Sequence, residues 1–314
     1  MHTVAGACVQ SDVIGALLAI LAMPPTCLPT ELGEAPAPVA VSVPAPAAPP
    51  GPAAQPASPL RPAPLAMNET ARYRIAYGVL DVGEVSLALE ADARQPLLRA
   101  RGEGAGSLLG LGRLETRVET EFDPTRLASR RWTTTRVRDG TTVLDRIEQS
   151  QDGRLAMARS RQGGAPASSV AQVSTAVLDP VSLLLRLRAS PPGIGMPPLV
   201  LTIIDGQALW RVTLVGAGLD MLGGERPALR LQGQADPILA DGRPDGGDRP
   251  QRSFRLWLSD DPTRVPLRLE MSIGPADLVV SLKDVKRQPP GARPSAPWWR
   301  ALGRRLAPRV SPTL

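Results

Sequence analysis

The strongest constraint on the fold is an alternation of apolar and polar residues with a period of two, which begins near Tyr73. Val85, Leu87 and Leu89 alternate with small or polar neighbours, and the same spacing recurs over residues 113–122. A strand with one buried and one solvated face produces this pattern. The region that starts near Tyr73 is therefore predicted to form an antiparallel sheet.

Turn signals divide this region into short strands. Aspartate followed by glycine, a signature of tight hairpins, separates strand-like runs at three places. These are Asp139-Gly140, Asp152-Gly153 and Asp205-Gly206. The last predicted strands cover residues 253–259, 266–273 and 277–285. Because consecutive strands usually pair, we expect a mainly β fold in which an antiparallel meander forms a curved sheet or an open barrel. Residues 236–252, rich in Asp, Gly, Pro and Arg, predict a mobile insertion between strands.

One segment has helical spacing instead. Asp179 is a good N-cap and Pro180 suits the first helical position, and the apolar residues that follow recur every three or four positions. The sequence predicts one helix over residues 179–189, packed against the curved sheet or plugging it.

The chain divides into four predicted parts. Residues 1–30 contain an apolar run of the length of a signal-peptide core and predict a signal peptide or a short membrane anchor. Lipidation at Cys27 and a buried core helix are the alternatives. Residues 31–66 are dominated by Pro and Ala and predict a disordered, extended linker. Residues 67–287 are predicted to form the β domain, and residues 288–314 a basic, flexible tail. This organisation predicts an exported protein of the periplasm, which the N-terminal segment could tether to the inner membrane.

The chain is basic, with an isoelectric point near 10.2, but the excess charge lies outside the β domain. Acidic and basic residues nearly balance over residues 67–286, whereas residues 287–314 carry several arginines and no acid. A nucleic-acid groove requires clustered basic residues interleaved with aromatics, and the domain has no such cluster in its sequence. We expect no nucleic-acid partner.

The tail has an amphipathic pattern. If it is helical, Trp298 and Trp299 fall on one side, while Arg300, Arg304 and Arg305 fall largely on another, an arrangement suited to anionic lipid headgroups. These five residues are candidates for contact with a membrane surface. A disordered tail with incidental amphipathicity is an equal alternative.

Candidate catalytic and metal-binding patterns are weak. The only histidine is His2 and the only cysteines are Cys8 and Cys27, so the domain has no imidazole or thiol of its own. Asp260 and Asp261 could act as paired carboxylates, but a turn before Pro262 explains them better. We therefore expect no enzymatic activity, no metal and no cofactor.

Two further patterns are candidate ligand sites. The first comprises the aspartates at 236, 241, 245 and 248, which miss the register of a calcium loop and are interpreted as a solvated loop. The second comprises the glycines at 102, 104, 106, 110 and 112, which do not form a dinucleotide-binding motif and indicate close strand packing.

Four segments together resemble a bacterial family of unknown function, domain family 3108. They are YRIAYGVLDVGEVSLALE, LDPVSLLLRLRAS, LTIIDGQALWRVTLVG and WLSDDPTRVPLRLEMSIGPADLVVSLKDV, spread over residues 72–285. The resemblance implies an exported β-rich protein with no assigned activity, and it carries over no catalytic residue. The family tends to have tyrosine around the helix, where this chain has leucine at positions 183–185.

The sequence supports two hypotheses about function. In the first, the domain binds a lipid-like or other apolar ligand, or an envelope protein, in a cleft between sheet and helix, because the helix face is all leucine. The candidate residues for that cleft are Leu183, Leu184, Leu187, Trp210 and Trp257. In the second, the domain is a structural or protein-interaction module of the cell envelope without a small-molecule ligand.

Overall fold

The computed structural model describes residues 68–91, 98–108, 112–123, 126, 128–138, 140–173, 175–206, 208–247, 249–273 and 276–287. The predicted signal segment, the Pro/Ala-rich linker and the basic tail lie outside the described residues.

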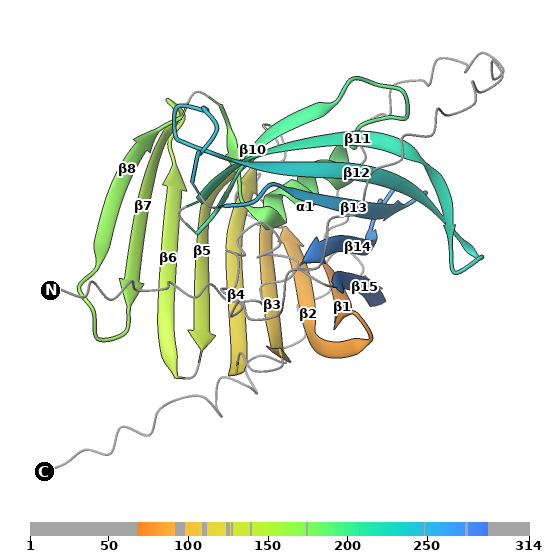
Figure 1. Cartoon of the computed structure of the whole chain (residues 1–314), viewed down its shortest axis with the longest axis horizontal. Helices are drawn as coiled ribbons and strands as arrows, with labels where there is room; N and C mark the ends of the chain where they lie inside the picture. The colour runs from red at the N-terminus through yellow and green to blue at the C-terminus, as the bar shows by residue number, and fades with distance from the viewer. Residues whose placement is uncertain are drawn as a thin grey trace, which may run out of the picture.

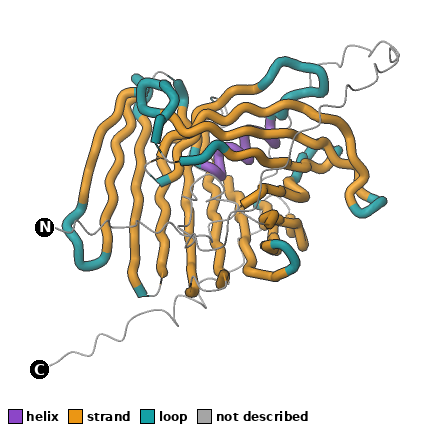
Figure 2. Tube along the Cα trace, in the orientation of Figure 1, coloured by secondary structure: helices purple, strands orange, loops and turns teal. Residues whose placement is uncertain are grey.

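The described residues form fifteen strands and one helix (Figure 2). The first half of the chain contributes β1 (Glu69–Tyr77), β2 (Leu80–Ala91), β3 (Leu98–Leu108), β4 (Gly112–Asp123), β5 (Ala128–Arg138), β6 (Thr141–Gln149), β7 (Arg154–Arg161) and β8 (Ala167–Gln172). The second half contributes β9 (Val177–Leu178), α1 (Pro180–Ala189), β10 (Leu199–Asp205), β11 (Ala208–Leu222), β12 (Arg226–Ile238), β13 (Arg252–Ser259), β14 (Pro266–Ile273) and β15 (Ala276–Arg287). No helix in this part of the chain has the length and apolar character to span a bilayer.

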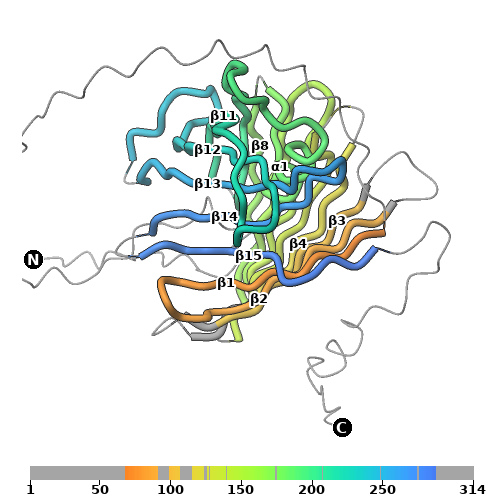
Figure 3. The backbone as a smooth tube through the Cα atoms, turned by 90° about the vertical axis from the view of Figure 1, so that its right-hand side faces the viewer, coloured from red at the N-terminus to blue at the C-terminus, as the bar shows by residue number. Residues whose placement is uncertain are grey.

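All fifteen strands belong to one sheet made of two meanders. In the first, β1 to β8 pair in chain order, and in the second, β10 to β15 do the same. The meanders join where β1 pairs with β15, and β9 pairs in parallel with β10. The sheet is not closed into a barrel. Figures 1 and 3 show it curling so that β10–β13 lie over the first meander, with α1 between them.

The structure confirms the predicted fold class and the single helix, which begins at Pro180 with Asp179 as its N-cap. The Asp-Gly positions at 152 and 205 separate paired strands, and both glycines have positive φ. At the first hairpin Gly140 also has positive φ, while Asp139 lies outside the described residues. The predicted insertion 236–252 is too long, because β12 continues to Ile238 and leaves a loop of residues 239–251. Ile238 is buried in a second core cluster, and this burial extends the strand.

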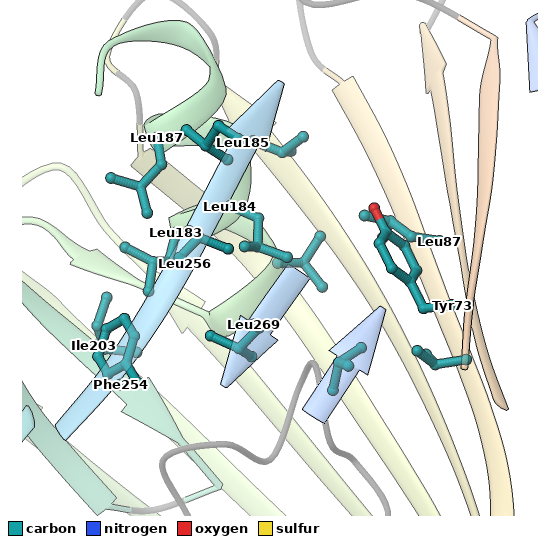
Figure 4. Packing of buried hydrophobic residues seen from close by; sticks show 14 of the residues in the cluster. Tyr73, Leu87, Leu183, Leu184, Leu185, Leu187, Ile203, Phe254, Leu256 and Leu269 are labelled. Atoms are coloured by element: carbon teal, nitrogen blue, oxygen red, sulfur yellow. The ribbon is translucent and has the colours of Figure 1, made fainter. Parts of the chain in front are cut away.

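Helix α1 is buried on nearly all sides. Arg186 is its only residue that is not buried. The helix contacts β4 and β5 on one side and β10 on the other, and its leucines join the main core cluster with the inward side chains of both meanders. Figure 4 shows this packing around Leu183, Leu184, Leu256 and Leu269. A helix that is buried all round is part of a core rather than a surface cover.

The N-terminus of the helix is fixed by a buried polar network around Asp179, which is fully buried. One carboxylate oxygen of Asp179 accepts hydrogen bonds from the first-turn amides of Val181 and Ser182. The other accepts from the hydroxyls of Thr120 on β4 at 2.6 Å, Ser129 on β5 at 2.7 Å and Ser182 at 2.5 Å. This carboxylate therefore caps the helix and attaches it to the first meander.

The C-terminal turn of the helix is fixed by Arg188, which is 1% exposed. Its guanidinium makes two hydrogen bonds to Glu69 of β1, at 2.7 and 3.2 Å, and a third to the carbonyl of Thr263. Arg287 of β15 donates to the same Glu69 carboxylate at 3.0 Å. One carboxylate thus links the helix to both strands of the seam between the meanders.

Replacing Arg188 by Met should lower the free energy of unfolding by about 3–5 kcal/mol, because the change leaves the Glu69 carboxylate with a buried and incompletely compensated charge. Urea denaturation measures the change. The matched control is Arg72→Met, which breaks the exposed ion pair with Asp284 and should leave the midpoint nearly unchanged. Equal midpoint shifts for the two variants would contradict a special role for the helix attachment.

Candidate functional site

Four of the five residues predicted to line a cleft lie in the packed core. Leu187 and Trp210 are 0% and 1% exposed, and Leu183 and Leu184 are 8% and 6% exposed. All four belong to the main core cluster. Their side chains fill the space between the helix and the sheet.

Trp257 lies on the other face of the sheet. Because Leu256 and Leu258 point inward on β13, alternation directs Trp257 outward. Its indole Nε1 donates to Asp220 at 2.9 Å, and the guanidinium groups of Arg255 and Arg268 lie 5.8 and 6.0 Å from the ring centroid. The run of apolar residues 256–258 was ambiguous in the sequence, since alternation can bury only two of the three on one face.

The outer face of the second meander carries a groove with a volume of about 480 Å³, lined by polar and apolar atoms in similar proportion. Two adjacent rows of side chains, contributed by neighbouring strands from β11 to β15, line it. The first row is Thr213, Gln234, Ser253, Ser272 and Asp277, and the second is Val215, Gln232, Arg255 and Glu270. The groove therefore runs across the strands. None of the four core residues that were predicted to line a cleft contributes to it.

Between the two rows lie Gly233, Phe254 and Met271, whose side-chain positions face the helix. A Cβ atom at Gly233 would lie 2.2 Å from Cζ of Phe254. Glycine at this position therefore allows the phenylalanine ring to pack flat against β12 on the inner face.

The groove lining is mostly neutral and hydrogen-bonding. Arg255 forms an ion pair with Glu270 at 2.7 Å, and the hydroxyl of Ser272 donates to Asp277 at 2.6 Å. The side chains of Thr213, Gln232 and Ser253 form no hydrogen bond with other described residues. Their hydroxyl and amide groups can both donate and accept hydrogen bonds. They are available to a ligand on this face.

A second polar cluster is buried where the β10–β11 hairpin meets the inner face of β5–β7. Arg136 donates to Asp145 at 3.3 Å and to Asp205 at 3.1 Å, and Arg159 binds Asp145 at 2.6 Å. Asp145 and Asp205 are 2% and 5% exposed. The cluster connects the tip of one meander to the inner face of the other.

Asp205 titrates unusually within this cluster. Burial removes water from the carboxyl group and raises its pKa to about 6, against the opposing effect of Arg136. Within the part of the chain that the structure describes, its Oδ2 atom has no hydrogen-bond partner, and neither do Nε1 of Trp210 and Nε of Arg252. The guanidinium of Arg252 lies 5.8 Å from the Trp210 ring centroid, and burial lowers the pKa of Arg252 to about 10. The sequence predicted Asp205 only as a turn residue, because no local signal reports that another part of the sheet covers the turn.

The other acidic candidates make local contacts. Oδ1 of Asp261 accepts a hydrogen bond from the backbone amide of Thr263 at 2.7 Å, inside the turn between β13 and β14. In the loop 239–251, Asp241 and Asp245 pair with Arg243 and Arg249. Asp248 lies outside the described residues, and so do the five tail residues Trp298, Trp299, Arg300, Arg304 and Arg305.

Fold and groove together define a curled antiparallel β protein that encloses one helix and presents polar side chains on its outer face. The chain belongs to the family described as "Protein of unknown function (DUF3108)", whose model matches residues 72–283. This match confirms the resemblance seen in the sequence motifs.

Comparison with solved structures gives two matches that cover most of this chain. One is a β-barrel-like protein of the domain of unknown function DUF1849 from Brucella abortus, with 12% identity, a TM-score of 0.48, and coverage of 72% of this chain and 100% of the other. The second is LprF from Mycobacterium bovis, with 13% identity, a TM-score of 0.27, and coverage of 73% and 88%. No curated protein matches the sequence.

The raised pKa of Asp205 predicts a specific dependence of stability on pH. The pKa of an aspartate in an unfolded chain is about 3.9. Between about pH 4 and 6 the folded protein therefore binds a proton that the unfolded chain releases. Protonation therefore stabilises the fold at low pH, and this contribution is lost as the pH rises to about 6. Relative to the Asp205→Asn variant, the free energy of unfolding of the wild type should fall by on the order of 2 kcal/mol from pH 4 to pH 7.

Urea denaturation at four pH values between 4 and 7 tests this expectation. The control is Glu225→Gln, in the exposed turn between β11 and β12. The difference in the free energy of unfolding between this variant and the wild type should stay nearly constant from pH 4 to pH 7. If the free energy of unfolding of the wild type instead rises with pH relative to that of Asp205→Asn, the ion pair with Arg136 stabilises the charged carboxylate more than burial destabilises it.

Proposed function

We propose that this protein is a non-enzymatic module of the bacterial cell envelope that acts through its outer surface and whose interior is filled by its own helix. The observation that carries the proposal is the embedding of α1, which is buried on nearly all sides and attached by buried polar networks at both ends. A carrier needs an interior that its ligand can occupy. Here the side chains of the protein occupy that space.

Export is supported by the sequence. The apolar run within residues 1–30 and the Pro/Ala-rich stretch 31–66 precede the β domain. We place the protein in the periplasm, tethered to the inner membrane, with the tail residues Trp298, Trp299 and Arg300 in contact with the membrane surface. This placement is consistent with a domain that binds a partner at a distance from the bilayer.

The absence of catalysis is inferred from the available side chains. Residues 67–287 contain no histidine and no cysteine, so the domain has no imidazole to activate a nucleophile and no thiol to act as one. Asp145 is engaged by two arginines, and Asp261 holds the backbone of its own turn. Carboxylates held in this way stabilise the fold and do not converge on a substrate position.

Binding of a lipid-like ligand is the second candidate function. The observation that favours it is a set of apolar side chains exposed near the edge of β11. Leu219 and Met221 are 59% and 58% exposed, and Ile194, which forms a bridge to Gly216 of β11, is 44% exposed. An apolar ligand could contact these side chains, but to reach the leucines of α1 it would have to displace the helix.

Replacing Leu184 by Phe distinguishes the two candidates. If the interior is filled, the larger ring overpacks the core and lowers the free energy of unfolding by about 1–3 kcal/mol. The control is Val79→Phe at a turn position that is 98% exposed, where the added volume lies in solvent and stability should not change. Mass spectrometry of organic extracts from the purified wild-type protein should find no stoichiometric lipid. A lipid that co-purifies with the wild type and is lost in Leu184→Phe at unchanged stability would establish the carrier function instead.

A further inference from the structure

We propose that the outer groove of the second meander binds a neutral oligosaccharide. This inference rests on the proposed function, since it assigns a ligand class to the outer surface. The first row of groove residues crosses neighbouring strands in register, so that small hydroxyl and amide groups form one continuous line. Five strands at about 4.8 Å spacing give that line a length of roughly 19 Å. This length suits a short chain of sugar units better than a single one.

The hydrogen-bonding chemistry of the lining matches sugar hydroxyls. Every hydroxyl of a sugar can both donate and accept a hydrogen bond. The hydroxyl groups of Thr213 and Ser253 and the amide group of Gln232 can do the same. These three have no side-chain partner among the described residues, so a ligand can bind them without breaking an internal hydrogen bond. Asp277, at the end of the first row, adds an acceptor for a pair of neighbouring hydroxyls.

Charge excludes an anionic polymer. The one arginine in the groove, Arg255, is paired with Glu270, and Asp277 adds a further negative charge. Nucleic acids and sulfated glycans bind through unpaired cationic side chains, and their affinity would here be opposed by the carboxylates. The lining therefore favours a ligand without net charge.

The position of the groove excludes an extended peptide that adds to the sheet as a strand. An extended peptide adds to a sheet by hydrogen bonding to a free strand edge, whereas this groove crosses β12, β13 and β14, which are all paired on both sides.

Isothermal titration calorimetry of the full-length protein with chitotetraose, cellotetraose and maltotetraose tests the proposal. We expect at least one of them to bind with a dissociation constant in the micromolar to millimolar range. The double variant Gln232→Ala/Gln234→Ala should weaken that binding about tenfold, as expected for the loss of two neutral hydrogen bonds. Ser253→Trp fills the centre of the groove at an exposed position and should abolish binding.

The matched control is Gln162→Ala, which removes an exposed glutamine in the turn between β7 and β8 and should bind like the wild type. Thermal melting of each variant verifies that the fold is intact. Failure of all three sugars to bind, or binding that both groove variants leave unchanged, would overturn the proposal. So would tighter binding of a heparin tetrasaccharide that weakens with salt. If the extracts of the purified protein contain no lipid and none of the sugars binds, the oligosaccharide inference is wrong. The proposed function, a module with a filled interior, is not contradicted by that result.

Discussion

The buried contact between Arg188 and Glu69 is the interaction on which the rest of the structure depends. Glu69 is the first residue of β1 and pairs with Arg287, the last of β15, where the two meanders meet. By accepting hydrogen bonds from Arg188 and Arg287, its carboxylate holds the helix against that seam. Burying such charges is costly, and the bidentate geometry with a third hydrogen bond to Thr263 offsets the cost.

The helix attachment determines which face of the sheet is free. A single curved sheet must bury one of its faces, and here the helix and the second meander cover the concave side of the first. Attachment at Asp179 and Arg188 leaves the helix little freedom to withdraw. The outer face therefore remains accessible, and on β11–β15 it carries the groove.

Much of the fold could be predicted from local sequence. Period-two alternation identified strands such as those around Val85 and Val118, and the Asp179-Pro180 pair identified the start of the helix, because both signals lie within a few residues. The seam between β1 and β15 could not be predicted, since it joins residues more than two hundred positions apart. The burial of Asp205 and the outward direction of Trp257 were missed for a similar reason. The burial of Asp205 depends on the distant strands that cover it, and the direction of Trp257 depends on which face of β13 the rest of the sheet encloses.

The groove was also missing from the sequence prediction. Thr213, Gln234 and Ser253 are ordinary polar positions on three separate strands, and they form a row only once the pairing register is known. A cleft was expected at the leucines instead, because an aliphatic helix face fits a packed core and a ligand site equally well. Burial of the helix on its remaining sides is what favours the core.

Amide hydrogen exchange along α1 tests the central claim most directly, because it reports whether the helix opens independently of the sheet. If the helix is a fixed part of the core, its amides and those of β1 and β15 should exchange only through global unfolding, with the same apparent free energy. Exchange in residues 183–189 that proceeds with a much lower free energy than in β1 would show a helix that opens on its own. That result would contradict a filled interior and favour a ligand site beneath the helix.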